Sequence, residues 1–303
     1  MQISFWLRKM MMLYSEKALQ IIFTSSQTYT IDSKWKSADV FLVGGGGSGG
    51  YPKVSSSATT GGASGAGAGY TKTEKNITLT SQEIDITIGA GAEAPYTTEG
   101  YHNNRDGNNG NKTTIVINGI SIDALGGYKG GSSYGTIFLI QGGAGGSGGG
   151  STGGTFGSST STETAGNGRG GSDGGNGGLA FWEKNGLYKE VAGGTGQGST
   201  TRAFEESGGT LYCGGGGSGE GRTGASYGTY TYPTAGGAGG GGHGRDTNVS
   251  TNATAYGGGG GGGRGGGSSV NGGNGYQGVV MVRLYKNSDR PTNIDWSKCT
   301  ITL

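Results

Sequence analysis

Residues 44–50 read GGGGSGG directly after the apolar run ADVFLV, and they contain the spacing G-x-G-x-x-G at Gly45, Gly47 and Gly50. In dinucleotide-binding proteins these glycines allow a sharp turn, a close approach to a pyrophosphate and the start of a helix. The residues that follow, YPKVSSSATTGGASG, lack the apolar spacing of an amphipathic helix. Chance matches are also expected in a chain with 76 glycines among 303 residues. We therefore predict no dinucleotide site here.

Other residues with catalytic potential are few. His102 and His243 have no second histidine or cysteine at a metal-ligand spacing, so we expect both in exposed loops. The carboxylates of Glu205 and Glu206 are adjacent in the chain, which makes the two side chains point apart rather than form an acid–base pair. We predict a non-enzymatic protein with no catalytic residues, no metal site and no cofactor.

Charge and cysteine usage narrow the possible partners further. The net charge is +2, and the 22 lysines and arginines are scattered rather than gathered on one face, which argues against nucleic acid as a partner. No run approaches eighteen apolar residues, so no membrane insertion is expected. Cys213 and Cys299 form no disulfide framework, and Cys213 is expected to be a small buried residue, although the sequence leaves the state of both thiols open.

Several segments have the composition of β-strands and argue against a disordered chain. Within IDITI, Ile84, Ile86 and Ile88 alternate with polar residues, as in a strand buried on one face. The other segments rich in β-branched and aromatic residues are predicted strands as well. They are FTSSQTYTI (23–31), ADVFLV (38–43), NITLTSQEIDITIGA (76–90), KTTIVINGISIDAL (112–125), YGTIFLI (134–140), GGTLYC (208–213) and QGVVMVRLY (277–285).

Glycine runs separate these segments. They lie at 44–50, 61–69, 126–131, 142–154, 166–178, 193–198, 208–221, 236–244, 257–267 and 272–278. Glycine has no side chain to bury, so backbone groups must provide the interactions that order these runs. A glycine run can adopt the extended polyproline II helix, with three residues per turn and no internal hydrogen bonds. We predict a bundle of such segments, here called rods, whose backbones hydrogen-bond laterally.

The ends of the chain are expected to lie outside this bundle. Residues 1–21 form an N-terminal attachment segment, with a short helix predicted over about residues 5–20 that either packs on the rest of the chain or serves docking or trimerisation. Residues 22–285 form the glycine-rich domain, and 286–303 a C-terminal extension. The predicted fold class is mainly β and irregular: a polyglycine II helix bundle clamped by short β-strands, β-sandwich-like, with the short N-terminal helix.

The order of several sequence blocks resembles the glycine-rich domain of bacteriophage and prophage tail fibre and adhesin proteins. These blocks are FTSSQTYTIDSKWKSADVFLVGGGGSGG, GYTKTEKNITLTSQEIDITIGAGA, GQGSTTRAFEESGGTLYCGGGGSG and GGNGYQGVVMVRL, which together cover roughly 22–285. The architecture also looks similar to the glycine-rich domain of anaplastic lymphoma kinase. The resemblance implies a component of a virion tail fibre or tip, assembled in the host cytoplasm, or else a bacterial surface protein.

Loop composition favours recognition over catalysis. The segments 95–112, 223–235 and 245–256 are rich in Tyr, Asn, Ser and Thr, residues that give rigid contact area and adaptable hydrogen bonding. We expect a homo-oligomeric receptor-binding adhesin that contacts a host-cell glycan or protein and other virion tail proteins; a purely structural fibre, sheath or filament subunit is the alternative. The candidate receptor-binding residues are Tyr96, Tyr101, Asn103, Asn104, Tyr227, Tyr230, Tyr232, Asn248, Asn252 and Tyr256.

Overall fold

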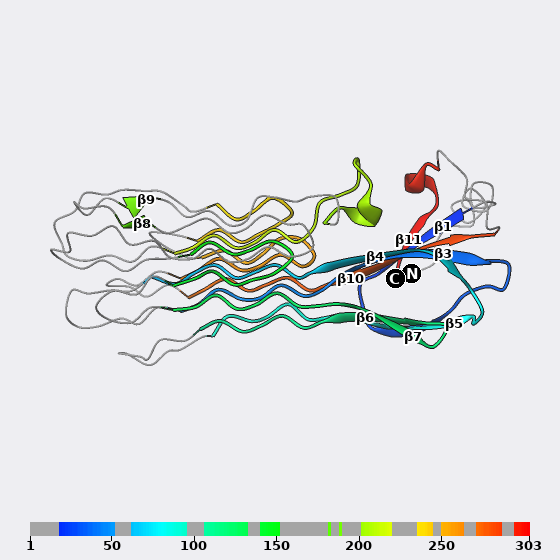
Figure 1. Ribbon diagram of the computed structural model, residues 1–303, viewed down its shortest axis with the longest axis horizontal. Helices are drawn as coiled ribbons and strands as arrows, with labels where there is room; N and C mark the ends of the chain where they lie inside the picture. Colours follow the sequence, from blue (N-terminus) through cyan, green and yellow to red (C-terminus); the bar gives the residue numbers. More distant parts are fainter. Residues whose placement is uncertain are drawn as a thin grey trace, which may run out of the picture.

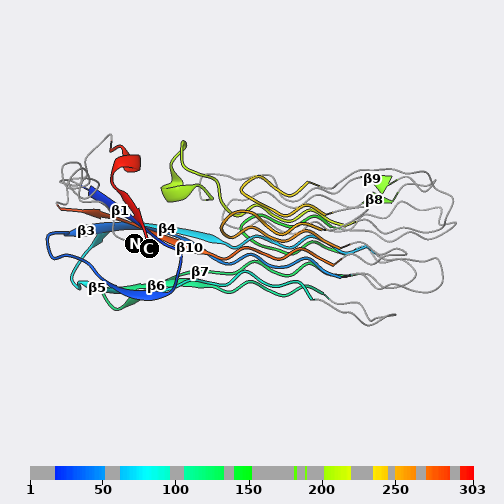
Figure 2. The ribbon, with the colours of Figure 1, turned by 180° about the vertical axis from the view of Figure 1, so that it is seen from behind.

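A computed structural model shows an elongated molecule with β-sheets at one end and a bundle of extended segments at the other (Figure 1). The structure describes residues 18–51, 62–95, 106–132, 140–151, 201–219, 235–244, 250–263, 271–286 and 294–303, together with the backbone of 181–182 and 188–189. We call the two ends of the molecule the sheet end and the distal end. The view from behind shows the same division (Figure 2).

Two sheets face each other at the sheet end. The first has the strand order β11-β1-β10-β3-β4 and the second the order β2-β5-β6-β7. Apart from the parallel pair β1–β11, the neighbouring strands in both sheets are antiparallel. The strands are β1 Ala18–Phe23, β2 Gln27–Thr30, β3 Ser37–Val43, β4 Thr71–Thr78, β5 Glu83–Thr87, β6 Thr113–Ile117, β7 Ile120–Ala124, β10 Val279–Tyr285 and β11 Thr300–Thr302, with the separate pair β8 Phe181–Trp182 and β9 Tyr188–Lys189.

An apolar core fills the space between the two sheets. Val40 and Leu42 of β3 alternate with residues that face outward, and Ile84 and Ile86 do the same on β5. Asp85 between them is exposed, so the predicted alternation in IDITI is confirmed. The class predicted from the sequence, mainly β and irregular with a β-sandwich-like arrangement of short strands, is confirmed as well.

The outer face of the five-stranded sheet is covered by the block 201–213. Phe204 and Cys213 are buried there in one apolar cluster with Phe41 of β3. The prediction that Cys213 is a small buried residue is therefore confirmed. The predicted strand over 208–213 is wrong, because only Leu211 forms an isolated bridge, with Arg202. Cys213 has a φ of 62°, which is incompatible with an extended strand.

The predicted N-terminal helix over about residues 5–20 is wrong for residues 18–20, the part of it that the structure describes. Residues 18–20 belong to strand β1, whose Ile21 and Phe23 are fully buried in the core. Pairing of β1 with β10 along its whole length overrides the local helical preference of the sequence. Residues 1–17 lie outside the described part of the chain. The strand β11 within the C-terminal extension was not predicted.

The rods continue directly from the strands. Rod 44–50 follows β3, rod 62–70 leads into β4, and rod 272–278 leads into β10. The rods 125–131 and 257–263 run alongside them toward the distal end (Figure 1). The predicted glycine runs at 166–178 and 193–198 and the predicted strand at 134–140 (except Ile140) lie outside the described residues.

Rod 44–50 shows the threefold symmetry of polyglycine II in its hydrogen bonds. The amides of Gly44, Gly47 and Gly50 all donate to carbonyls of rod 62–70, at 2.9, 3.0 and 3.4 Å. The residues between them, taken in turn, donate to two other rods: Gly45 and Ser48 to 107–111, and Gly46 and Gly49 to 272–278. Each third residue therefore points to the same neighbour, as expected for three residues per turn.

Carbonyls of the same rod accept from three further segments. Gly45 O accepts from Gly127 N, Gly46 O from Ala92 N, and Gly47 O from Gly260 N, each at 2.9 Å. Rod 44–50 is thus enclosed by the three rods to which it donates and the three from which it accepts. Rods 62–70 and 257–263 are enclosed in the same manner, and each of these three rods contacts the other two. The predicted bundle of laterally bonded glycine rods is confirmed.

Candidate recognition end of the rod bundle

The described residues that flank the candidate loops lie in the rod bundle. The chain leaves the described bundle at Pro95 and returns at Asp106, and it leaves at Gly219 and at Gly244 to return at Ala235 and Ser250. These positions lie within or beside the three segments that the sequence marks for recognition, and residues 106–112 and 250–256 of those segments are themselves part of the described bundle. The strands lie at the opposite end of the rods (Figure 1).

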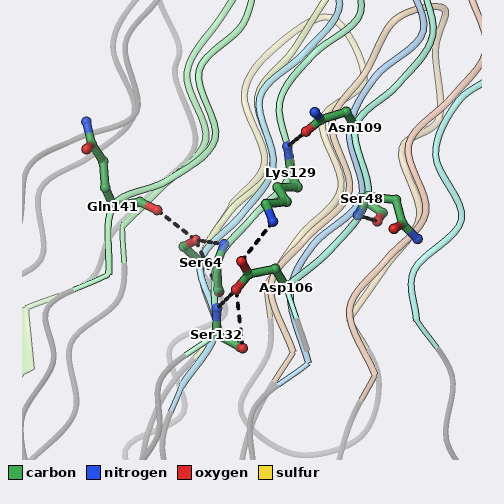
Figure 3. A network of polar contacts seen from close by, with 9 residues as sticks. Ser48, Ser64, Asp106, Asn109, Lys129, Ser132 and Gln141 are labelled. Carbon is green, nitrogen blue, oxygen red and sulfur yellow. Dashed lines mark hydrogen bonds and ion pairs between the residues drawn. The ribbon is translucent and has the colours of Figure 1, made fainter. Parts of the chain in front are cut away.

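A polar network ties the rods together just before the chain leaves them (Figure 3). The carboxylate of Asp106 accepts from the Ser132 amide at 3.1 Å, and its second oxygen lies 2.9 Å from Lys129 Nζ. Asn109 Oδ1 accepts from the Lys129 amide at 2.9 Å. Asp106 and Asn109, three residues apart on one rod, therefore accept from the amides of Ser132 and Lys129, which are three residues apart on the neighbouring rod.

Serine takes over backbone interactions inside this network. Ser64 Oγ accepts from Gly131 N at 2.7 Å and lies 3.0 Å from the Gln141 carbonyl, to which it donates (Figure 3). Ser48 Oγ accepts from the Asn108 amide at 2.8 Å. Ser48 and Ser64 are fully buried, so these hydroxyls satisfy groups that water cannot reach. Each hydroxyl thus takes the place of a backbone carbonyl as the acceptor for an amide of a neighbouring rod.

Asparagine has a structural role at the edge of the bundle that sequence reasoning missed. Asn274 Oδ1 accepts from the Ala94 amide at 2.8 Å, and Asn108 Nδ2 donates to the Glu93 carbonyl at 2.8 Å. Such side chains bind backbone groups that face away from the interior rods. The recognisable signal is the spacing in DGNNGNK, where Gly107 and Gly110 recur every third residue.

Two of the ten candidate receptor-binding residues lie in the described part of the chain. Asn252 is exposed, and its Oδ1 accepts from the Asn274 amide at 2.8 Å. Tyr256 is half-buried near the sheet end, where its ring centroid lies 6.3 Å from that of Tyr212 and 5.5 Å from that of Tyr276. The structure therefore does not bring Asn252 and Tyr256 together as one surface.

The other eight candidates fall outside the described residues. They are Tyr96, Tyr101, Asn103, Asn104, Tyr227, Tyr230, Tyr232 and Asn248. Each belongs to a segment whose described neighbours lie in the rod bundle. Their assignment to receptor binding stays a prediction.

The residues considered first for chemistry have other partners. Gly45 N and Gly47 N donate to the carbonyls of Asn111 and Gly67, so these amides are not available to a pyrophosphate. His243 Nδ1 accepts from the Gly236 amide at 3.1 Å. His102 lies outside the described residues. Within the described ranges, no three histidine, cysteine or acidic residues are grouped as a metal site would require.

Glu205 and Glu206 contact different cations. Glu205 Oε2 lies 3.6 Å from Lys75 Nζ, whereas both oxygens of Glu206 contact the guanidinium of Arg283. The two carboxylates thus point to separate partners, as the sequence predicts. Burial raises the pKa of the Cys213 thiol, which keeps it protonated in its apolar surroundings. No helix in the described ranges is both long and apolar enough to span a membrane.

Fold and bundle define an all-β protein whose glycine rods form a core of backbone hydrogen bonds. The family model of the glycine-rich domain matches residues 23–285, which is most of the chain. The chain therefore belongs to the glycine-rich domain family. Among curated proteins, none matches it significantly.

Proposed function

We propose that this protein is a non-enzymatic component of a virion tail fibre or tip, and that it acts as a receptor-binding adhesin. Its partners are a host-cell glycan or protein and other virion tail proteins, and it works as a homo-oligomer. It is assembled in the host cytoplasm; a bacterial surface location is the alternative setting. Within the loops 95–112, 223–235 and 245–256, the parts outside the described bundle form the binding surface, with Tyr227, Tyr230 and Tyr232 as the main contacts.

The observation that carries this proposal is that the enclosed rod positions contact mainly backbone, which leaves recognition to other segments of the chain. Interior positions have every neighbouring direction filled by backbone, so they offer no side chains to a partner. Asp106, where the first of these segments re-enters the described bundle, contacts Lys129 and Ser132 and so joins rods 106–112 and 125–131. A rigid scaffold with variable loops at one end is a common arrangement in recognition proteins.

Replacement of Tyr227, Tyr230 and Tyr232 by alanine tests the assignment. Aromatic contacts usually carry a large part of a binding energy, with costs of about 2 kcal/mol or more on truncation. We expect attachment to host cells or glycans to be lost while the thermal melt stays nearly unchanged. Retained attachment, or a collapsed fold, would contradict the assignment of binding to these tyrosines.

One observation favours the alternative, a structural fibre, sheath or filament subunit. Leu125 and Tyr128 lie three residues apart on one rod and are 56% and 51% exposed. On a threefold rod such residues point the same way, so they form an apolar stripe along the side of the bundle rather than at its end. Electron micrographs decide between the two functions: isolated tips support the adhesin, and continuous filaments support the structural subunit.

A further inference from the structure

Steps in which glycine follows asparagine are the places where a protein chain undergoes spontaneous deamidation most readily. The glycine amide nitrogen attacks the asparagine side-chain carbonyl, and the missing Cβ of glycine leaves the approach open. Four such steps lie in the described part of the chain: Asn109–Gly110, Asn118–Gly119, Asn271–Gly272 and Asn274–Gly275. The four steps consist of the same two residues, so differences in their reactivity come from the fold.

Two hydrogen bonds protect the step Asn274–Gly275. The Gly275 amide donates to the Ala92 carbonyl at 2.9 Å, which withholds the attacking nitrogen. Asn274 Oδ1 accepts from the Ala94 amide at 2.8 Å, which holds the side-chain carbonyl against the neighbouring rod. Both bonds must break before the nitrogen can reach the carbonyl carbon, and breaking each of them is unfavourable.

The step Asn109–Gly110 is protected in the same manner. The Gly110 amide donates to the Gly127 carbonyl at 2.9 Å. Asn109 Oδ1 accepts from the Lys129 amide, also at 2.9 Å. Both bonds join this edge rod to rod 125–131, so the packing of the two rods restrains the nitrogen and the carbonyl together.

The step Asn118–Gly119, at the turn between β6 and β7, has side-chain bonds only. Asn118 Oδ1 accepts from the amides of Thr80 and Ser81, at 2.9 and 3.1 Å. Its Nδ2 donates to the Thr78 carbonyl at 2.7 Å. The Gly119 amide donates to no described residue. At this step the carbonyl is held in place, but the nitrogen is free.

The step Asn271–Gly272 has neither kind of bond. Among the residues that the structure describes, none accepts a hydrogen bond from the Gly272 amide, and none bonds to the side chain of Asn271. Asn271 is also partly exposed, so water reaches it. This step therefore lacks both restraints that the steps Asn109–Gly110 and Asn274–Gly275 possess.

The geometry of the rods explains why the Gly272 amide is unpaired. Every third amide of rod 272–278 donates to the antiparallel rod 88–94, in the pairs Gly278–Gly89 and Gly275–Ala92. The next pair in this series would join Gly272 to the carbonyl of Pro95. The chain leaves the described bundle at Pro95, so the series ends one pair too early for Gly272.

We propose that Asn271 is a deamidation site of the folded protein, and that the rods protect Asn109 and Asn274. Gly272 N forms a bond to Asn271 Cγ, the bond from Cγ to Nδ2 breaks, and ammonia leaves with the Gly272 amide proton. Water then opens the resulting succinimide ring at either of its carbonyls, which gives aspartate or isoaspartate. Each product adds a negative charge at the start of rod 272–278, and isoaspartate also lengthens the backbone there by one carbon.

Peptide mapping of the folded full-length protein, aged in mildly alkaline buffer, tests the proposal. Mass spectrometry of the digested chain gives the rate of deamidation at each of the four steps. We expect Asn271 to react fastest, and Asn109 and Asn274 to react at least about tenfold more slowly, because two hydrogen bonds must open first. We also expect both aspartate and isoaspartate at 271, since direct hydrolysis of the side-chain amide would give aspartate alone.

The same full-length chain aged in denaturant is the control. Without the rods, the four steps are expected to react at similar rates, because each joins asparagine to glycine. Similar rates in the folded protein as well, or a faster reaction at Asn109 or Asn274 than at Asn271, overturn the proposal. Aspartate without isoaspartate at 271 overturns it too, because the Gly272 amide is then not the attacking group.

Discussion

Gly260 illustrates how little room the bundle leaves at a single residue. Its amide donates to the Gly47 carbonyl, and a Cβ at this position would overlap the carbonyl oxygen of Gly273. The obstacle is backbone rather than a flexible side chain, so it cannot move without breaking other hydrogen bonds. Glycine is needed here for close approach, and the same reasoning applies to Gly47 and Gly67 in the other enclosed rods.

The change Gly260→Ala is therefore expected to be strongly destabilising. Overpacking a filled interior costs up to about 3 kcal/mol, and more where the backbone must shift. The matched control is Gly208→Ala, because Gly208 is exposed and a Cβ there meets nothing within 4 Å. Thermal melts of the two variants provide the measurement. Equal melting temperatures would contradict the close packing of rod 257–263.

Rods differ according to how many neighbours surround them. Enclosed rods need small residues at nearly every position, whereas a rod at the edge of the bundle needs them only where it faces inward. In 106–112, a Cβ on Gly107 or Gly110 would overlap carbonyls of rod 44–50, but Asn108 and Asn109 are exposed. The asparagines then bind backbone groups at the edge, much as protein sheets protect their edge strands.

Proline substitution tests whether a particular rod amide donates a hydrogen bond to a neighbouring rod. Proline fixes φ near the polyproline II value and removes the amide hydrogen. The Ala92 amide donates to Gly46 O at 2.9 Å, whereas the neighbouring Glu93 amide donates to no described residue. We expect Ala92→Pro to cost about 3 kcal/mol and Glu93→Pro to stay within about 1 kcal/mol of the parent in chemical denaturation. Equal losses at both positions would exclude the threefold arrangement of this rod.

How far the sequence predicts these elements depends on the local pattern. The strands β3, β5, β6 and β10 and the glycine runs were predictable, because alternation and glycine content are properties of short windows. Rods 88–94 and 106–112 were not, because edge rods contain few glycines and their spacing of three is weak evidence alone. Strands β1 and β11 are defined by pairing with distant residues rather than by their own composition.

The candidate site was less predictable than the fold. Asparagine-rich stretches suggest recognition, yet Asn109, Asn252 and Asn274 bind backbone groups of neighbouring rods in the structure. The same side-chain amide suits both purposes, so composition cannot separate them. What decides is whether the residue lies beside a rod, which depends on long-range packing.

The molecule as a whole joins two kinds of core along its length. At the sheet end, side chains such as Phe23, Leu42 and Ile115 pack between two sheets. Beyond the strands, the same chain continues into rods whose contacts are made by amides and carbonyls. Rods 44–50 and 272–278 extend directly from β3 and β10, so the sheets fix the lateral positions from which the rods start (Figures 1 and 2).

Hydrogen exchange over the whole chain should map this arrangement. Consecutive amides in enclosed rods, such as Gly45, Gly46 and Gly47, all donate to other rods and are expected to exchange slowly. In the edge rod, Gly110 and Asn111 should be protected, but Asn109, whose amide donates to no described residue, should exchange fast. Residue-resolved exchange by NMR gives the measurement. Fast exchange throughout 44–50 would show that the bundle does not persist in solution.

The backbone core also affects how stability depends on temperature. Unfolding of ordinary domains raises the heat capacity, because apolar surface becomes hydrated, whereas exposure of polar surface lowers it. The enclosed rods bury mainly peptide groups, so their unfolding adds a small or negative contribution to the heat-capacity change. A smaller change flattens the curve of unfolding free energy against temperature. We therefore expect the stability curve of this protein to have less curvature than that of a domain of the same size with an apolar core throughout.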